Sequence, residues 1–376
     1  MGWNSRRTIL VILIVFIAVA AFAYFYRDNS QEIVVGAISP FSGDGAQYGE
    51  TARTGIDLAV SEINAAGGVQ KKKLSIQYED DRGDATAAVS AFNKLTSVDK
   101  VSAVLGPFYS GNVLAAAAVA NRTMTPMISG SATSDNIRLA GPYVFRVCPS
   151  NDEQARTIAN YARTVLKLKT AFILYRNADY GVTLRSAFEK AFPAAGGTIV
   201  GAEAVKPDTS DVRAQLAKVK AANPDMIFAA VHFPEGGALL RQSKEIGVTA
   251  TVIGTDGGQD PELIKIAGDA AEGSYWATIG WGSQHTNSEV AKFKAAYHAK
   301  YGADPGVYSA LYYDATKVLA EALSHAKSMS GPDILVALHQ VNYVGPTGQT
   351  VFDANGDVSK PFAVFEVKKG QFVPVP

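Results

Sequence analysis

From residue 31 onward, short runs of β-branched and other apolar residues alternate with longer segments that have helical patterns of ten or more residues. Runs such as IVVGAI, LSIQYE, VSAVLG, TAFILY and MIFAAV have the length and composition of buried strands. Strands that are separated by helices of this length form parallel β-α-β units. The pattern therefore predicts an α/β fold in which mainly parallel sheets are flanked by helices.

Two segments share one order of elements. Residues 84–106 and 211–232 each contain an aspartate, an amphipathic helix, a second aspartate and a buried strand, which suggests two similar lobes. The C-terminal third differs, with helical patterns around residues 288–301 and 309–328 and then a β region at residues 345–367. Because the chain has 376 residues and no low-complexity linker, we expect two lobes between which it passes several times.

The N-terminal segment has the pattern of an export signal. An apolar run follows two arginines and spans Ile9–Tyr26. Ala21 and Ala23 form an A-x-A site that is consistent with cleavage, whereas the aromatic end of the run is typical of a membrane interface. Residues 1–30 are therefore either a signal peptide or an N-terminal membrane anchor, and both alternatives stay open.

Composition excludes several classes of partner. Lys plus Arg and Asp plus Glu each number 35, so no net field would attract nucleic acid or anionic lipid. Cys148 is the single cysteine, so the fold has no intramolecular disulfide. The five histidines lack metal-ligand spacing, and the sequence has no G-x-S-x-G, P-loop or H-E-x-x-H motif. We therefore predict a protein that is not an enzyme and needs neither metal nor cofactor.

Polar and aromatic residues gather at the carboxyl ends of the predicted strands, where open parallel sheets bind ligands. In VLGPFYSGN, Gly106 and Pro107 end a buried strand and Ser110 lies at the start of the next helix. The segment SGSAT places Ser131 and Thr133 after the next strand. Hydroxyls beside free helix amides suit a carboxylate, which a helix N-terminus also attracts. The alternative is that Ser110 merely caps its helix.

Several segments resemble one family, the type I periplasmic solute-binding proteins typified by the leucine/isoleucine/valine-binding protein of bacterial ABC transporters. They are SGDGAQYGE, GIDLAVSEINAAGGV, ISGSATS, DYGVTLRSAF, FPEGGALLRQSKEIG and IAGDAAEG. The resemblance implies two lobes joined by a three-segment hinge. We expect the first lobe to comprise residues 31–147 plus 277–350, and the second lobe to comprise residues 148–276 plus 351–376.

The resemblance also implies a ligand site. Ser110, Ser131 and Thr133 would hold the carboxylate and ammonium groups of an amino acid on the first lobe. Tyr180 and Asp256 would bind the ammonium from the second lobe. Asp256 stands where the family usually has glutamate, which is longer by one methylene.

The ligand's side chain would contact an aromatic wall made of Tyr48, His232 or Phe233, and Tyr308. The paired cysteines of the branched-chain binders would fall near Gly83 and Tyr109, and both are absent here. Tyr109 would then reshape the side-chain pocket. Together with Phe108, Trp276 and Trp281, it favours an aromatic or larger aliphatic ligand. Trp276 and Trp281 could equally pack in the core or the hinge.

These features predict an extracytoplasmic solute-binding protein, in the periplasm or at the outer face of the cytoplasmic membrane of a bacterium. It would capture a small amino acid, branched-chain or otherwise apolar or aromatic, between two closing lobes and deliver it to an ABC transporter permease. The membrane would be a further partner if the N-terminal segment is not cleaved. Alternatives are a binder of amides, urea-like compounds or aromatic acids, and an anchored ligand sensor.

Overall fold

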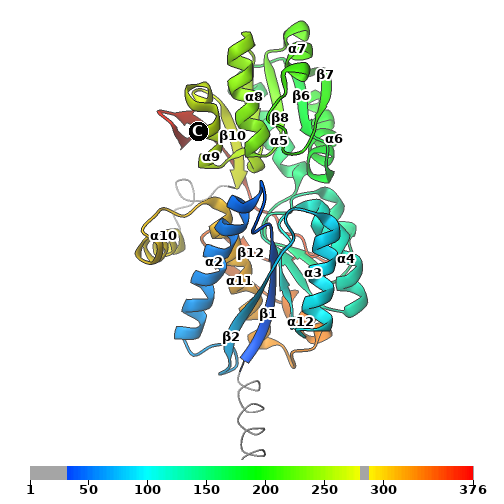
Figure 1. Ribbon diagram of the computed structural model, residues 1–376, viewed down its shortest axis with the longest axis vertical. Coiled ribbons are helices and arrows are strands. Elements are labelled where there is room, and N and C mark those ends of the chain that lie inside the picture. Colours follow the sequence, from blue (N-terminus) through cyan, green and yellow to red (C-terminus); the bar gives the residue numbers. More distant parts are fainter. Residues whose placement is uncertain (1–31, 280–287, 376) are drawn as a thin grey trace, which may run out of the picture.

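The computed structural model describes residues 32–279 and 288–375. The prediction of a signal peptide or membrane anchor in residues 1–30 lies outside this part of the chain. Among the described residues, no helix has both the length and the apolar character needed to span a bilayer. The described chain forms two lobes, one above the other in Figure 1.

The first lobe is built on a parallel sheet (Figure 1, lower half). The strand order is β2 (Lys73–Asp80), β1 (Glu32–Ser39), β3 (Val104–Leu105), β4 (Met127–Ser129) and β5 (Val144–Arg146). The helices of this lobe are α2 (Ala46–Ala65), α3 (Ala85–Ser97), α4 (Ser110–Thr123), η1 (Asp135–Leu139), α10 (Ser288–Tyr301), α11 (Val307–His325) and α12 (Gly331–Leu338). A separate hairpin joins β11 (Tyr343–Gly345) to β12 (Gly348–Thr350).

The second lobe contains a larger, mixed sheet. Its strand order is β14 (Gln371–Pro374), β13 (Phe362–Lys368), β10 (Tyr275–Ile279), β9 (Thr251–Gly254), β8 (Met226–Ala230), β6 (Thr170–Arg176) and β7 (Thr198–Val205). Neighbours from β10 to β7 are parallel, whereas β13 and β14 are antiparallel. Its helices are α5 (Asn151–Thr164), α6 (Asp179–Ala194), α7 (Arg213–Ala222), α8 (Phe233–Ile246), η2 (Asp256–Gly258), α9 (Pro261–Ala267) and η3 (Gly268–Ala271).

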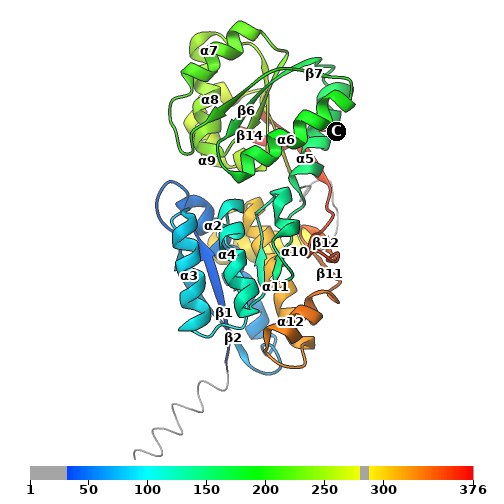
Figure 2. The same cartoon turned by 90° about the vertical axis from the view of Figure 1, so that its right-hand side faces the viewer.

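Helices cover both faces of each sheet, because the central strands are apolar on both sides. In β1, Ile33 and Val35 pack in one buried cluster with α2 and α11, and Ile38 packs in another with α3 and α4. In the second lobe, α5 and α6 cover one face of the sheet and α7, α8 and α9 cover the other (Figure 2). The predicted two-lobed α/β fold with mainly parallel sheets is confirmed.

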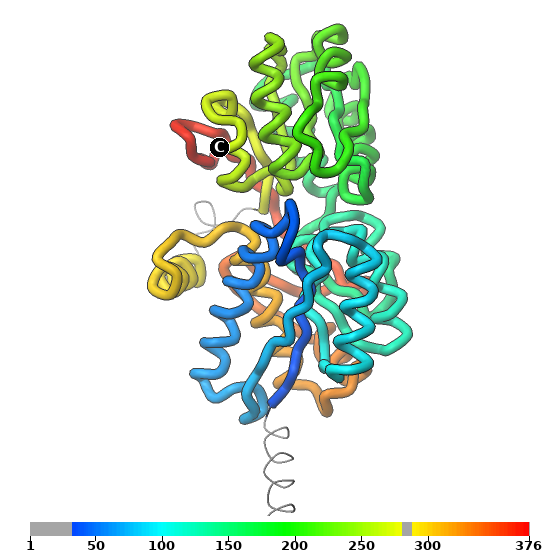
Figure 3. Tube along the Cα trace, in the orientation of Figure 1, coloured from blue at the N-terminus to red at the C-terminus, as the bar shows by residue number. Residues whose placement is uncertain are grey.

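The chain passes between the lobes three times: after β5, after β10 and after β12. Residues 280–287 of the second passage lie outside the described chain. The lobe borders expected from the sequence stay a prediction. In the structure β10 continues past residue 276 to Ile279 and pairs along its whole length with β13. The last passage returns the C-terminal strands to the second lobe, as the red end of the tube shows (Figure 3).

Candidate ligand-binding site

The carboxyl ends of the parallel strands in both sheets point to the place where the lobes meet, and the predicted site residues are found there. All of them are buried. Those of the first lobe are Tyr48, Ser110, Ser131, Thr133 and Tyr308, and those of the second are Tyr180, His232, Phe233 and Asp256.

The loop after β3 positions Ser110. Gly106 has a φ of +92°, and a Cβ there would lie 2.2 Å from the carbonyl oxygen of Ile38, so only glycine fits. Tyr109 is the N-cap residue of α4 and Ser110 is its first helical residue. The Ser110 Oγ accepts a hydrogen bond from the Ser134 amide at 3.2 Å. The alternative that Ser110 merely caps its helix is therefore wrong, because its hydroxyl bonds to the neighbouring loop instead.

The loop after β4 positions Ser131 and Thr133 beside this helix start. The Ser131 hydroxyl donates to the Phe108 carbonyl oxygen at 2.7 Å. The Thr133 carbonyl oxygen accepts from the Asn151 amide at 2.8 Å. Thr133 Oγ1 is buried and has no hydrogen-bond partner in the described chain. Thr133 therefore offers a free hydroxyl, whereas the hydroxyl of Ser131 already serves the fold.

Tyr180 and Asp256 come together in the second lobe. The Tyr180 hydroxyl donates to Asp256 Oδ1 at 2.8 Å and accepts from the Gly257 amide at 3.0 Å. Burial raises the pKa of the Asp256 carboxyl to about 6, while the hydrogen bond from Tyr180 acts in the opposite direction. Among the described residues, no lysine, arginine or histidine forms an ion pair with Asp256. The site thus holds a buried carboxylate that has no cationic partner in the part of the chain that the structure describes.

An aromatic cluster spans both lobes, and we define it as Tyr48, Phe108, Tyr109, His232, Phe233 and Tyr308. The ring centroid of Tyr48 lies 4.9 Å from that of Phe108 and 4.9 Å from that of Phe233. The Tyr48 hydroxyl donates to the Gly257 carbonyl oxygen and accepts from the Phe233 amide at 3.2 Å. Both hydrogen bonds cross from one lobe to the other, so the structure has a closed cleft.

A second tyrosine also bridges the lobes. The Tyr308 hydroxyl donates to the Asp256 carbonyl oxygen at 3.1 Å, and its ring lies 4.9 Å from that of Phe108. Direct contacts thus join six of the predicted site residues across the lobes: Tyr48, Tyr180, His232, Phe233, Asp256 and Tyr308. Phe108 links this group to Ser131. Ser110 directly follows Tyr109, and Asn151 links Thr133 to Tyr180 by donating to the carbonyl oxygens of both.

Tyr109 fills space that two glycines leave open. A Cβ at Gly45 would lie 2.3 Å from the Tyr109 hydroxyl oxygen, and a Cβ at Gly83 would lie 3.0 Å from its Cε2. The ring stacks on His232 of the other lobe, with centroids 5.2 Å apart and planes at 18°. Tyr109 therefore forms part of the wall between the lobes, in the region where the sequence predicts a reshaped pocket.

A buried charged group was missing from the predicted site. Arg176, at the end of β6, donates to Asp208 Oδ1 at 3.0 Å and to Glu235. Burial and the charge of Arg176 hold the pKa of His232 well below its usual value. A charged residue that ends an otherwise apolar strand is the signal that could have identified Arg176.

Trp276 packs in the core of the second lobe. A Cβ at Gly254 or Gly258 would lie within 2.1 Å of its ring, and its Nε1 donates to Ser274 Oγ at 2.9 Å. The core-packing alternative for Trp276 is therefore confirmed, whereas Trp281 lies outside the described residues.

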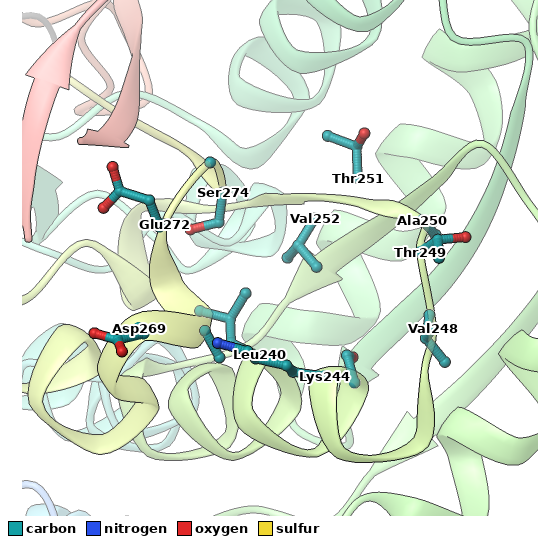
Figure 4. Close-up of a pocket in the computed structure, with 13 residues that line it drawn as sticks. Leu240, Lys244, Val248, Thr249, Ala250, Thr251, Val252, Asp269, Glu272 and Ser274 are labelled. Atoms are coloured by element: carbon teal, nitrogen blue, oxygen red, sulfur yellow. The ribbon is translucent and has the colours of Figure 1, made fainter. Parts of the chain in front are cut away.

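A separate pocket lies on the second lobe between the end of α8, the start of β9 and η3 (Figure 4). It is lined by Lys244, Asp269 and Glu272 together with small and apolar residues. None of the predicted site residues borders it. Its charges are mixed, and it is distinct from the cleft.

This two-lobed fold agrees with comparisons to known proteins. A family model described as "Periplasmic binding protein" matches residues 32–371. The chain belongs to this family, in the branch of the branched-chain amino acid binders, whose members are extracytoplasmic solute-binding proteins rather than enzymes.

Three similar proteins illustrate this relationship. The leucine-, isoleucine-, valine-, threonine-, and alanine-binding protein of Pseudomonas aeruginosa is 30% identical over 94% of each chain. The substrate-binding protein LivJ of Streptococcus pneumoniae, solved with isoleucine, is 30% identical with a TM-score of 0.86 and covers 92% of this chain and 99% of its own. A solute-binding protein of Rhodopseudomonas palustris, solved with 3,4-dihydroxy benzoic acid, is 25% identical with a TM-score of 0.83 over 92% and 96%.

Proposed function

We propose that this protein is the solute-binding component of an ABC transporter and that it captures a small α-amino acid in the cleft. The observation that carries the proposal is the pairing of a buried carboxylate with an unpaired hydroxyl in one cleft. Asp256, which has no cationic partner in the described chain, suits an ammonium group, and Thr133 Oγ1 suits a carboxylate. The relatives named for amino acids support the same ligand class.

In this proposal the first lobe binds the carboxylate. Ser110 is the first residue of α4, where unpaired helix amides and the helix dipole favour a negative charge. Thr133 precedes Ser134, whose amide bonds to the Ser110 hydroxyl. The backbone of Ser131 completes this side of the site. The second lobe binds the ammonium through Asp256, and Tyr180 orients that carboxylate by the hydrogen bond to Oδ1.

The aromatic cluster would surround the ligand's side chain, and its rings offer mainly apolar contact area. Tyr48 and Tyr308 join the lobes directly, so a ligand held by both lobes adds to contacts that the closed form already has. Binding would therefore shift the population of open and closed molecules toward the closed form. A permease that recognises the closed form would receive the ligand.

We further propose that the protein works in the periplasm or at the outer face of the cytoplasmic membrane. The sequence of residues 1–30 supports export, and retention of that segment would attach the protein to the membrane.

A ligand screen tests the proposal. The purified protein is freed of co-purified ligand by partial unfolding and refolding, and its melting temperature is measured with each common amino acid, with small amides and with aromatic acids. A ligand that binds only the native state raises the melting temperature, and calorimetry then gives its affinity. We expect shifts with α-amino acids. A shift only with amides or with acids that lack an ammonium group would contradict the amino acid assignment.

An aromatic acid is the second candidate ligand. The relative solved with 3,4-dihydroxy benzoic acid and the ring-rich cleft favour it. Such an acid would leave Asp256 without a cation, so it should bind more tightly once Asp256 is protonated. Benzoate binding that strengthens at pH 5 would support this candidate.

A further inference from the structure

His232 belongs to the aromatic cluster of the cleft, and its Nδ1 has no hydrogen-bond partner in the described chain. His232 immediately precedes α8 and is only 6% exposed. Its Nδ1 is buried and unpaired among the residues that the structure describes. Buried polar atoms are paired in nearly all folded proteins, so an unpaired one inside a binding cleft indicates where a ligand group binds.

The rings around His232 do not supply that partner. Its centroid lies 5.2 Å from that of Tyr109, 4.9 Å from that of Tyr180 and 5.7 Å from that of Tyr48. The hydroxyl of Tyr48 is already bonded to the backbone of the second lobe. The hydroxyl of Tyr180 is bonded to Asp256 and to the Gly257 amide.

The orientation of the ring separates His232 from the ammonium end of the site. A Cβ at Gly257 would lie 2.5 Å from the Cδ2 of His232, so this edge of the imidazole packs against η2. Nδ1 lies on the opposite edge of the ring from Cδ2, so it faces away from Gly257. Because Asp256, which would hold the ammonium, lies beside Gly257 in η2, we expect a ligand group that reaches Nδ1 to come from the side chain.

The charge state of His232 narrows the chemistry of that group. Burial and the nearby Arg176 keep the imidazole neutral, while Asp208 and Glu235 hold Arg176 in place. A neutral imidazole has one nitrogen that donates and one that accepts. A hydroxyl or carboxamide can do either, so it suits both tautomers. A hydrocarbon would leave Nδ1 unpaired, and a cationic side chain would meet the charge of Arg176.

We infer that the ligand carries a hydroxyl or carboxamide group in its side chain and that this group hydrogen-bonds to His232. The inference rests on the proposed function, because it assumes that the ammonium is held at Asp256. According to this inference, His232 determines whether the site prefers a polar or an apolar ligand side chain of the same size. A site that is built to bond a polar group discriminates against an analogue that lacks it.

Matched pairs of amino acids test the inference by calorimetry on the ligand-free protein. Threonine and valine have the same shape, as do asparagine and leucine. We expect the polar member of at least one pair to bind about tenfold more tightly, as one net hydrogen bond predicts. His232→Phe keeps a ring but removes both nitrogens and should abolish the preference. His298→Phe, the same change on an exposed part of α10, should retain it.

Equal or tighter binding of both apolar members to the wild-type protein overturns the inference, whether or not the His232→Phe variant folds. Failure of every α-amino acid to bind contradicts the proposed function instead. In that case benzoate and 4-hydroxybenzoate form the matched pair. A preference for the hydroxyl compound that disappears in His232→Phe supports the role of His232, and equal binding of the two acids overturns it.

Discussion

The two lobes contribute different chemistry to the cleft that they share. The first lobe supplies hydroxyls and the start of α4, and the predicted contacts there, Ser110 and Thr133, are uncharged. The second lobe supplies groups whose pKa values are shifted by burial, among them Asp256 and His232. The first lobe can thus accept a carboxylate through dipoles, whereas the second carries a charge that needs a counterion. Substitutions that leave a charge unbalanced should therefore affect binding most.

Asp256→Asn should have the largest effect. It would leave the ligand's ammonium buried without a counterion, which costs about 3 to 5 kcal/mol, or about two to three and a half orders of magnitude in affinity. Calorimetry with the best amino acid from the screen measures this. Asp260→Asn is the control, since Asp260 is equally buried in the same lobe but caps α9. A loss below threefold in Asp256→Asn would reject the ammonium role.

Ser110→Ala should cause the second-largest loss of affinity. A hydrogen bond to an ionised group contributes about 1.5 to 3 kcal/mol, so affinity should fall about ten- to hundredfold. Ser330→Ala is the matched control, because Ser330 caps α12 in the same lobe. That control should lower the melting temperature and leave affinity unchanged. If both variants behave alike, Ser110 has only a structural role.

Acid should weaken binding by a smaller amount. The pKa of Asp256 is about 6 without ligand, and an ammonium would lower it, so the ligand binds the deprotonated form. Affinity should therefore be fully present above pH 7 and should fall about tenfold by pH 5. Calorimetry between pH 5 and pH 7 tests whether affinity falls as the pH falls. In Asp256→Asn the affinity should no longer depend on pH. A pH-independent affinity in the wild-type protein would mean that Asp256 does not face the ammonium.

Tyr48→Phe should have the smallest effect, because it weakens the closure of the lobes but removes no group that binds the ligand's ammonium or carboxylate. It removes two hydrogen bonds between lobes, and we expect about a fivefold loss of affinity. Small-angle scattering of the ligand-free protein should show a larger radius of gyration. Tyr301→Phe is the control, since that hydroxyl bonds to Thr54 within the first lobe. An unchanged radius together with unchanged affinity would show that Tyr48 does not stabilise closure.

The sequence was a good guide where the signal is local. Strands such as β8 are uniformly apolar because both faces are covered, and the loops that follow β3 and β4 could be located from that pattern. The stack of Tyr109 on His232 could not be predicted, because it depends on how the lobes meet. Arg176 is marked in the sequence as the charged end of an apolar strand, but its partners Asp208 and Glu235 could not be predicted, because they come from two further segments.

The slot that holds Tyr109 makes three positions interdependent. An alanine at Gly45 or Gly83 would crowd the Tyr109 ring and disturb its stack on His232. A smaller residue at 109 would instead leave the two glycines facing empty volume. Positions 45, 83 and 109 must therefore be changed together to alter the ligand that the cleft accepts. A single replacement would leave either a steric clash or a cavity.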